Sequence, residues 1–505
     1  MKIVLDSGQM GEVDKYTIEE IGIPSMVLME RAALSVAEEI MARAKQDMRI
    51  LSVCGIGNNG GDGVAAARIL TERGYTVDIL LVGDAGKAST QMKEQLAIAK
   101  RCGLHFVEEE QAAQEKYGWI LDALFGIGLS REVKGIYRDA IEMINRSKSN
   151  ILAVDIPSGI SGSDGKVQGI AVKADVTVTF GVAKMGLLLY PGREYAGETL
   201  VKEIGFPAAA FTQVKPAAYT YETEDLQRLP ERKADSHKGT YGRVLVIAGQ
   251  KNMSGACYLA GSAAYRSGAG LVELLTVEDN RSIMQSTLPE AVLTTYDPAD
   301  IKEPETVSKI TDRMKAADAV VIGPGLGQSE EAKALLSLVI RQCETPMVLD
   351  ADALNLLAEN LSYYLSVGHP ENWILTPHIL EMARLLDVDK ENVLSDMIPL
   401  GREFVRRTGV VLVLKNAATL VFEGDELYIN TTGNNGMSTG GSGDVLSGIT
   451  GAFLAAGKSR FEAAKLAVLV HGMAGDWMEE KSNAYSLTAT DIVEGLRYVL
   501  KREIP

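Results

Sequence analysis

Gly55-Ile-Gly-Asn-Asn-Gly-Gly-Asp-Gly63 follows the apolar run Ile50–Cys54 and precedes the helical pattern Val64–Arg73. A β-branched run, a glycine-rich turn and a helix in this order are typical of the βα unit that opens a doubly wound parallel sheet. The spacing fits GxGxxG, whose glycines let backbone amides close on an anionic group at a helix N-terminus. An ordinary tight turn needs neither five glycines nor two asparagines and an aspartate, so the turn predicts a binding site.

The same alternation of β-branched runs, glycine-rich turns and Ala/Leu-rich stretches continues from Arg49 onward, and it predicts an α/β fold with parallel sheets. In the first part of the chain, strands are expected at Ile50–Cys54, Thr76–Val82, Trp119–Leu124, Ile151–Ile156 and Val176–Phe180. In the second part, they are expected at Val244–Ala248, Gly270–Val277, Ala319–Gly323, Met347–Asp350, Trp373–Thr376 and Val410–Leu414. Before the first strand, Glu19–Arg43 has the pattern of a helix.

A break in this pattern lies between Phe206 and Pro216, where two prolines and an alanine run show no sustained periodicity. We place a domain boundary there, with one domain at 1–215 and a second at 216–505. A chain of 505 residues ordinarily holds two or three domains of roughly 150 residues each. Both parts are therefore long enough to bury a hydrophobic core.

The charge balance bears on the class of partner. Lys and Arg total 51 against 67 Asp and Glu, which gives a net charge of −16. Nucleic-acid binding relies on clustered positive charge, and the sequence has no basic stripe. We therefore expect no nucleic-acid partner.

The four cysteines, Cys54, Cys102, Cys257 and Cys343, lie far apart and form neither a disulfide framework nor a CxxC metal site. This usage fits a reducing compartment. Residues 1–10 lack a basic segment followed by an apolar one, and no apolar run approaches the roughly 18 residues of a membrane span. We expect a cytoplasmic protein without a membrane partner.

Two aspartates stand at the ends of expected strands, Asp122 before Gly126–Arg131 and Asp155 before Ile156-Pro-Ser158. The carboxyl ends of parallel strands line the ligand crevice of such a sheet. One carboxylate alone could be a helix cap, but two from different strands, together with Asp62, favour a binding site. Asn59, Asp122 and Ser158 offer only oxygen ligands, which suit a hard cation better than zinc.

A second glycine-rich turn, Gly433-Asn-Asn-Gly-Met-Ser-Thr-Gly-Gly-Ser-Gly-Asp444, leads into an apolar helical pattern from Val445. Successive amides in such a turn form an anion hole at a helix N-terminus. Asp444 then stands where it can take a proton from a hydroxyl group. The alternative is a simple N-cap, but a cap does not require Gly440, Gly441 and Gly443 before it.

Four further motifs of the second part each follow an expected strand and can converge on Asp444: Gly323–Gly327, Asp350-Ala-Asp352, Thr376-Pro-His378 and Lys415–Thr419. No HExxH, GxSxG or CxxC pattern is present, so zinc hydrolysis and serine acyl transfer have no support. Gly457-Lys-Ser459 matches the tail of a phosphate-binding loop, but a helix precedes it, and we interpret it as a helix end.

These motifs carry a resemblance. The first part resembles the NAD(P)HX epimerase domain across residues 1–215, through Asn58–Asp62, Asp122 with Gly126–Arg131, Val154–Ser158 and Phe180–Lys184. The second part is similar to the ADP-dependent NAD(P)HX dehydratase, through Ser254–Ala256, Gly323–Gly327, Thr376–His378, Lys415 and Gly440–Asp444. The whole chain resembles the family of bifunctional nicotinamide-hydrate repair enzymes.

The resemblance implies a Rossmann-like three-layer domain followed by a ribokinase-like α/β domain. The first would interconvert the R and S forms of NADHX and NADPHX, in which the nicotinamide ring has added water. The second would dehydrate the S form using ADP. Potassium would bind the epimerase domain and magnesium would accompany ADP, and we expect a homo-oligomer.

The resemblance also implies residue roles. In the first domain the hydrate would contact Asn58, Asn59, Gly60, Gly61, Asp62, Gly126, Ile127, Gly128, Leu129, Ser130, Arg131 and Asp155, with Asp155 as the catalytic acid/base. Potassium would be held by Asn59, Asp122 and Ser158. In the second domain the hydrate would contact Ala256, Gly325, His378 and Asp444, with Asp444 as the catalytic base. The adenine nucleotide would contact Lys415, Asn416, Ala417, Ala418, Thr419 and Gly443.

The chain departs from the family pattern in places: Ile379 and Leu380 follow His378, Asn416 follows Lys415, and Met185 precedes Gly186. The role of Lys184 is left open. The alternative function is a ribokinase-like small-molecule kinase with a non-catalytic nucleotide-binding first domain. Nothing in the second glycine-rich turn distinguishes ADP from ATP.

Overall fold

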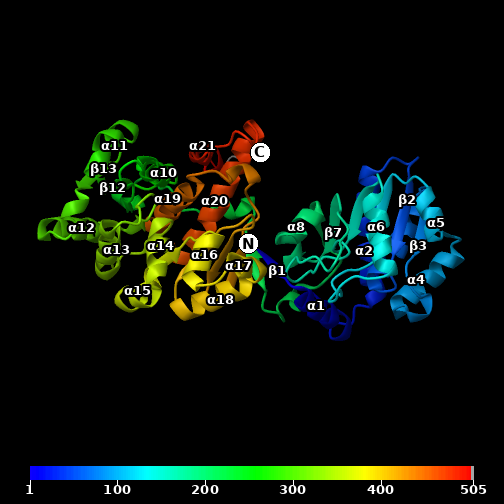
Figure 1. The fold of residues 1–505 in the computed structure, drawn as a ribbon. Coiled ribbons are helices and arrows are strands. Elements are labelled where there is room, and N and C mark those ends of the chain that lie inside the picture. The colour runs from blue at the N-terminus through cyan, green and yellow to red at the C-terminus, as the bar shows by residue number, and fades with distance from the viewer. Residues whose placement is uncertain (502–505) are drawn as a thin grey trace. The chain divides into compact units, whose positions relative to one another are not determined.

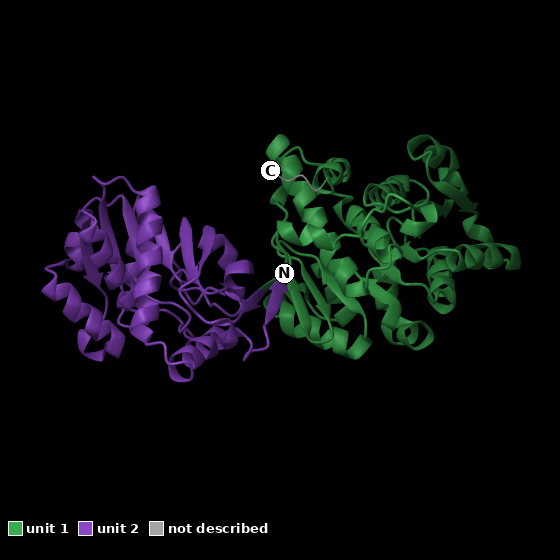
Figure 2. Ribbon diagram, turned by 180° about the vertical axis from the view of Figure 1, so that it is seen from behind, with its two compact units in different colours: residues 1–2, 220–505 green, residues 3–219 purple. Residues whose placement is uncertain are grey.

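A computed structural model describes residues 1–501 of the chain. They divide into two compact units, one of residues 3–219 and one of residues 1–2 with 220 onward (Figure 2). Among the described residues, no helix is long and apolar enough to cross a membrane. Each unit has its own sheet and hydrophobic core.

The unit of residues 3–219 is built on a parallel sheet of seven strands in the order β4-β3-β2-β5-β6-β7-β9. Their bounds are β2 Arg49–Cys54, β3 Thr76–Leu81, β4 His105–Phe106, β5 Trp119–Ala123, β6 Asn150–Val154, β7 Val176–Phe180 and β9 Glu198–Lys202. Two short strands, β1 Lys2–Leu5 and β8 Ala183–Lys184, pair in parallel.

Helices cover both faces of this sheet because successive strand residues point to opposite sides. Ile50 and Cys54 of β2 pack with α2, α3 and α4, whereas Leu51 and Val53 pack with α5 and α6. The helices are α1 Ser7–Glu19, α2 Ser25–Arg43, α3 Asn58–Glu72, α4 Thr90–Arg101, α5 Glu109–Gln114, α6 Ile136–Arg146, α7 Met185–Leu188, α8 Gly192–Ala196 and α9 Ala208–Phe211. The expected Rossmann-like three-layer arrangement is confirmed.

The larger unit has strands in the order β13-β12-β11-β14-β15-β16-β17-β18-β19, parallel as far as β17 and antiparallel beyond it. Their bounds are β11 Arg243–Ile247, β12 Leu271–Val277, β13 Val292–Tyr296, β14 Ala319–Ile322, β15 Met347–Leu349, β16 Trp373–Leu375, β17 Val411–Leu414, β18 Leu420–Glu423 and β19 Glu426–Ile429. A further short strand, β10, spans Ala218–Thr220.

One face of this sheet is covered by α10, α19, α20 and α21, whose apolar residues form a core with Val244 and Val246 of β11 (Figure 1). Helix α19 packs against both α10 and α20. The helices of the unit are α10 Ser254–Arg266, α11 Arg281–Thr287, α12 Pro304–Lys315, α13 Glu330–Gln342, α14 Asp352–Glu359, α15 Leu361–Val367, α16 Ile379–Leu386, α17 Lys390–Ser395, α18 Met397–Thr408, α19 Ser442–Ala455, α20 Arg460–Lys481 and α21 Ala489–Val499.

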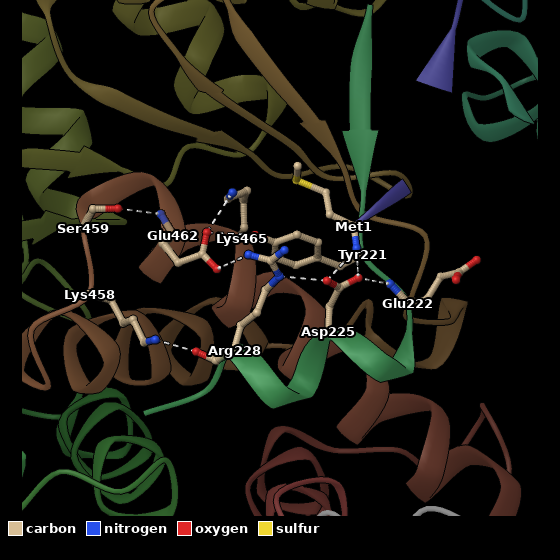
Figure 3. Close-up of polar contacts among 9 residues, drawn as sticks. All are labelled: Met1, Tyr221, Glu222, Asp225, Arg228, Lys458, Ser459, Glu462 and Lys465. Carbon is tan, nitrogen blue, oxygen red and sulfur yellow. Dashed lines mark hydrogen bonds and ion pairs between the residues drawn. The ribbon is translucent and has the colours of Figure 1, made fainter. Parts of the chain in front are cut away.

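The larger unit also holds the start of the chain in a polar cluster (Figure 3). The amine of Met1 donates to both carboxylate oxygens of Asp225, at 2.6 and 2.7 Å, and Arg228 Nε donates to the same carboxylate at 2.8 Å. Asp225 is buried, and the two cations hold its pKa below the ordinary value against the effect of burial. This cluster pairs a buried carboxylate with two more exposed cations.

The expected strands are all present, within two residues at each end. Two helix predictions were wrong in their bounds. Glu19–Arg43 is not one helix, because Gly22 adopts φ +84° and Pro24 precedes α2. The helix predicted from Val64 begins at Asn58, so Asn58–Asp62 form its first turn rather than a loop. Gly457–Ser459 joins α19 to α20, as predicted for a helix end.

Candidate functional site

A cavity of about 970 Å³ opens in the smaller unit where the carboxyl ends of β2, β5 and β6 meet. Its volume is that of a small-molecule site. Of the residues expected to hold the hydrate, the wall includes Asn58, Asn59, Asp62, Gly126, Ile127, Gly128, Leu129, Arg131 and Asp155. The described wall does not include Gly60, Gly61 or Ser130.

The glycines of α3 serve packing. A β-carbon at Gly60 would lie 1.9 Å from the carbonyl oxygen of Gly55, and one at Gly61 would lie 2.7 Å from Met29 Cε. A side chain at Gly63 would collide with Ala123 of β5. The turn therefore needs these glycines to bring α3 close to the sheet, which leaves Asn58, Asn59 and Asp62 to face the cavity.

Asp155 and Lys184 form a buried ion pair at the cavity wall, although the chain separates them. Lys184 Nζ lies 2.8 Å from Asp155 Oδ1, and also donates to Thr179 Oγ1 at 2.8 Å and to the carbonyl of Phe180 at 2.7 Å. The lysine side chain is 1% exposed. Asp155 Oδ2 lies toward Gly126, where a β-carbon would be 3.3 Å away. The ammonium thus fixes one oxygen of Asp155 while the other faces the space beside Gly126.

Asp155 has a backbone φ of +66°, a conformation that side chains other than glycine, asparagine and aspartate rarely adopt. Its amide donates to the carbonyl of Val178 at 2.7 Å. Strain of this kind persists where the surroundings over-determine it, and it clusters at functional sites. The turn after β6 thus places Asp155 in the cavity by an unusual backbone geometry.

Two more carboxyl groups line the same cavity. Burial raises the pKa of Asp62 well above its ordinary value, and the charges of Asp155 and Asp14 add to this. Burial also raises the pKa of Asp14, with a further contribution from Asp155. Asp14 lies on α1, outside every motif of the sequence, and was not predicted. The pairing of Lys184 was not predicted either, although a lysine within an apolar run was a signal.

Asp122 lies behind the cavity with Ser158. Ser158 donates to it from its backbone amide at 2.7 Å and from its hydroxyl at 2.6 Å, and the same hydroxyl accepts from the amide of Phe125 at 2.9 Å. Burial raises the pKa of Asp122 to about 6, although the Ser158 hydrogen bonds oppose this. Asn59 Oδ1 faces Gly126, and its Nδ2 is buried without a hydrogen-bond partner among the described residues. The oxygens of Asn59, Asp122 and Ser158 are of the kind that a hard cation prefers. Within residues 1–501, no group of three or more His, Cys, Asp or Glu side chains is placed to hold a metal ion.

In the larger unit, the second glycine-rich turn ends at the N-terminus of α19. Gly441 is the residue before the helix, with φ +90°, and Asp444 lies in the first turn. The N-cap alternative for Asp444 is therefore wrong, since the cap position is occupied by a glycine. Burial raises the pKa of Asp444 to about 7, with a further contribution from Asp350, so the group is suited to proton transfer near neutrality.

Lys415 lies at the same helix end. Its Nζ is 2.7 Å from Asp350 Oδ1, and a β-carbon at Gly443 would be only 3.2 Å from it. Burial alone would lower the pKa of Lys415, but Asp350 foremost and then Glu381 raise it, so the ammonium stays charged. Positive charge and free amides at a helix N-terminus together favour an anionic group.

The other residues expected at this site lie in the loops after β14, β16 and β17 and at the start of α10. Gly325 adopts φ +55°, and a β-carbon there would lie 2.9 Å from Cβ of Ala256, so these two are neighbours. His378 caps α16, its Nδ1 accepting from the amides of Leu380 and Glu381 at 3.1 and 3.2 Å. A β-bridge joins His378 to Lys415. Asn416, Ala417, Ala418 and Thr419 form the turn between β17 and β18.

His471 of α20 belongs to no sequence motif, but it contacts the second glycine-rich turn. Its Nε2 lies 3.0 Å from the carbonyl oxygen of Ser442 and 3.2 Å from the hydroxyl of the same residue. Burial lowers the pKa of His471 to about 4, so the ring is neutral. It therefore supports the first residue of α19 rather than supplying charge.

Two protein-family models match the chain, one in each compact unit. A family model described as NAD(P)H-hydrate dehydratase matches residues 244–497, and one described as YjeF-related protein N-terminus matches residues 25–186. The bifunctional NAD(P)H-hydrate repair enzyme Nnr of Thermofilum pendens is 37% identical over 97% of this chain and 94% of its own length. That of Coxiella burnetii is 38% identical over 99% of this chain and 100% of its own length.

The chain belongs to the family of bifunctional NAD(P)H-hydrate repair enzymes. The family resemblance and the ribokinase-like fold expected for the second domain are thereby confirmed. The crystal structure of the ADP/ATP-dependent NAD(P)H-hydrate dehydratase from Bacillus subtilis with ATP/Mg²⁺ is 31% identical, with a TM-score of 0.50 over 56% of this chain and 98% of that one. A ribokinase-like superfamily protein from Enterococcus faecalis gives 30% identity and a TM-score of 0.51, over 56% of this chain and 96% of its own.

Proposed function

We propose that the chain repairs hydrated NADH and NADPH with two sites, an epimerase site within residues 1–215 and a dehydratase site within residues 216–505. The observation that carries the proposal is that each part holds its own acid/base group at a built site, buried in the first part and partly buried in the second. One is Asp155, paired with Lys184 at the wall of the large cavity. The other is Asp444, at the glycine-rich start of α19.

In the epimerase site, the hydrate lies in the cavity along Asn58, Asn59, Asp62 and Gly126–Arg131. The carbon–oxygen bond at the hydrated ring carbon breaks, water leaves and re-adds from the other face, and Asp155 gives and then takes back the proton of this water with the oxygen that Lys184 does not hold. Burial raises the pKa of Asp62 well above its ordinary value, which favours the protonated form that can donate a hydrogen bond to the substrate. Two carboxyl groups in unlike environments thus take complementary roles.

Potassium would be held by Asp122 and Ser158, whose oxygens lie within hydrogen-bond distance of each other, together with Asn59 from the first turn of α3. Asp122 is fully buried, and no ion pair to it is present within residues 1–501, so a cation would compensate its charge. The ion would supply a fixed positive charge behind the substrate.

Replacing Asp122 by Asn is expected to remove the dependence of the first domain on potassium. Saturating K⁺ should raise the unfolding free energy of the wild-type chain by about 2.7 kcal/mol at a concentration near 100 times Kd. Thermal melting in KCl and in LiCl measures this difference, which should vanish in Asp122→Asn together with any K⁺ stimulation of epimerisation. An equal melting shift in both proteins would contradict the assignment.

In the dehydratase site, Asp444 takes the proton of the ring hydroxyl, and the oxygen attacks the terminal phosphoryl group of ADP. The amides of Gly440–Gly443 stabilise the charge that develops on this group, and AMP leaves. The phosphorylated carbon then loses phosphate and the ring loses a proton, which restores NADH or NADPH. Magnesium on the nucleotide would neutralise phosphate charge. Lys415–Thr419 hold the nucleotide, and Ala256, Gly325 and His378 hold the hydrate.

Incubation of the full chain with mixed-epimer NADHX, K⁺, Mg²⁺ and either ADP or ATP tests both sites. Absorbance of reduced nicotinamide should recover completely with ADP, faster than spontaneous epimerisation supplies the S form. Recovery of the S fraction alone would contradict the epimerase activity of the first domain. No recovery would favour the small-molecule kinase alternative. The comparison of ADP with ATP decides which nucleotide the chain prefers.

We also place the protein in the cytoplasm, since all four cysteines are free thiols and three of them are buried. The homo-oligomer expected from the sequence stays a prediction. Light scattering of the purified chain measures its mass directly.

A further inference from the structure

Asp350 occupies a bridging position that the mechanism above does not use. It follows β15, and its carboxylate is 1% exposed. Oδ1 accepts from Lys415 Nζ at 2.7 Å, and Oδ2 accepts from the hydroxyl of Ser447 at 2.7 Å. Ser447 lies on α19, three residues after Asp444. One carboxylate therefore links the lysine to the helix that carries the base.

The bridge fixes which way Lys415 faces. The side chain of Lys415 is 20% exposed and that of Asp350 is 1% exposed, so the carboxylate is the more deeply buried partner of the pair. A β-carbon at Gly443 would lie 3.2 Å from Lys415 Nζ and 3.7 Å from Asp350 Oδ2. The ammonium therefore packs closely against the backbone of Gly443. The ammonium is thereby held next to the amides that begin α19.

We propose that Asp350 is a positioning residue of the dehydratase site, which holds the ammonium of Lys415 at the N-terminus of α19 in register with Asp444. This inference rests on the proposed dehydratase function. Its physical basis is that phosphoryl transfer is accelerated by charges that are already in place before the reaction. Without Asp350, Lys415 still attracts the nucleotide, but its ammonium is no longer held where it stabilises the transition state.

The same carboxylate acts on Asp444 through space. The groups whose charges reach Asp444 are Asp350, Lys415, Asp352 and Glu381, and among them Asp350 makes the largest contribution to its raised pKa. Neutralising Asp350 removes a negative charge near the base and so lowers the pKa of Asp444. Since the base acts when deprotonated, the acid limb of the pH profile should move to lower pH.

The test is Asp350→Asn in the full chain, which keeps the size of the side chain and its hydrogen-bonding oxygen. With S-NADHX and ADP, kcat should fall at least about tenfold, while KM for ADP does not rise because the positive charge near the phosphates remains. The acid limb of kcat should shift to lower pH. Lys415→Met, in contrast, should raise KM for ADP.

Asp225→Asn is the matched control, because Asp225 is another buried aspartate of this unit, and its partners are the Met1 amine and Arg228 rather than residues of the glycine-rich turn (Figure 3). It should lower the melting temperature and leave kcat and the pH profile unchanged. Ser447→Ala is a milder second variant that removes only the link to α19, and it should lower kcat without moving the acid limb.

The inference is overturned if Asp350→Asn keeps the wild-type kcat and pH limb, or if its activity falls only in proportion to folded protein. If Asp350→Asn does not fold, an unchanged kcat in Ser447→Ala overturns it instead. Failure of the proposed function gives a different result, namely a wild-type chain that does not dehydrate S-NADHX at all.

Discussion

Asp444→Asn is expected to lower the rate of dehydration of S-NADHX by at least about 100-fold, the contribution of a general base. Asparagine keeps the shape of the side chain but cannot take the proton of the ring hydroxyl. The amides of the glycine-rich turn and the ammonium of Lys415 remain, so ADP binding measured by calorimetry should stay near its wild-type value. The loss therefore concerns the chemical step and not the nucleotide.

The pH profile gives a second readout. Burial raises the pKa of Asp444 to about 7, so wild-type kcat should fall as pH drops below that value and protonates the base. The folded state favours the neutral carboxyl group, and its ionisation therefore costs stability at higher pH. Asparagine imitates the neutral form, so the variant should melt no lower than the wild type at pH 8. Unchanged turnover in a folded variant would exclude Asp444 as the base.

Much of the fold follows from local pattern. Buried parallel strands such as Val244–Ala248 are runs of β-branched and apolar residues between glycines, and the observed β11 differs from this prediction by one residue at each end. Strands β18 and β19 were missed, although Gly424 and Asp425 between them have the composition of a two-residue hairpin turn. Gly424 adopts φ +55°, which a turn of this kind requires.

The candidate sites were likewise predicted only in their contiguous parts. Glycine-rich turns are contiguous in the sequence, so both were found, and Asp444 was placed beside the correct helix end. Pairs formed across the sheet are not contiguous. Lys184 meets Asp155, and Asp350 meets Lys415, only because parallel strands bring their carboxyl ends together. The motifs placed Asp350 and Lys415 at one edge of the sheet, but sequence spacing does not say which side chains pair there.

Asp155→Asn is expected to slow epimerisation of a pure hydrate epimer by about 100-fold or more, without changing dehydration of the S form. The substitution suits this position, because asparagine tolerates the backbone φ of +66° and can still accept from Lys184 and Thr179. It removes only the charge and the ability to take a proton. Conversion of R-NADHX measured alone, and S-NADHX dehydration with ADP, separate the two activities in one preparation.

The matched control for this variant is Asp78→Asn. Asp78 is also a buried aspartate of the smaller unit, paired with Arg49 at 2.8 Å and hydrogen-bonded to Tyr117 at 2.8 Å, and it is not part of the cavity wall. Its loss removes a buried ion pair and should lower the melting temperature while leaving epimerisation intact. If Asp155→Asn and Asp78→Asn slow epimerisation equally, Asp155 acts through stability. If Asp155→Asn alone slows it and S-form dehydration is unchanged, the acid/base role stands, because only a group at the cavity wall reaches the ring carbon.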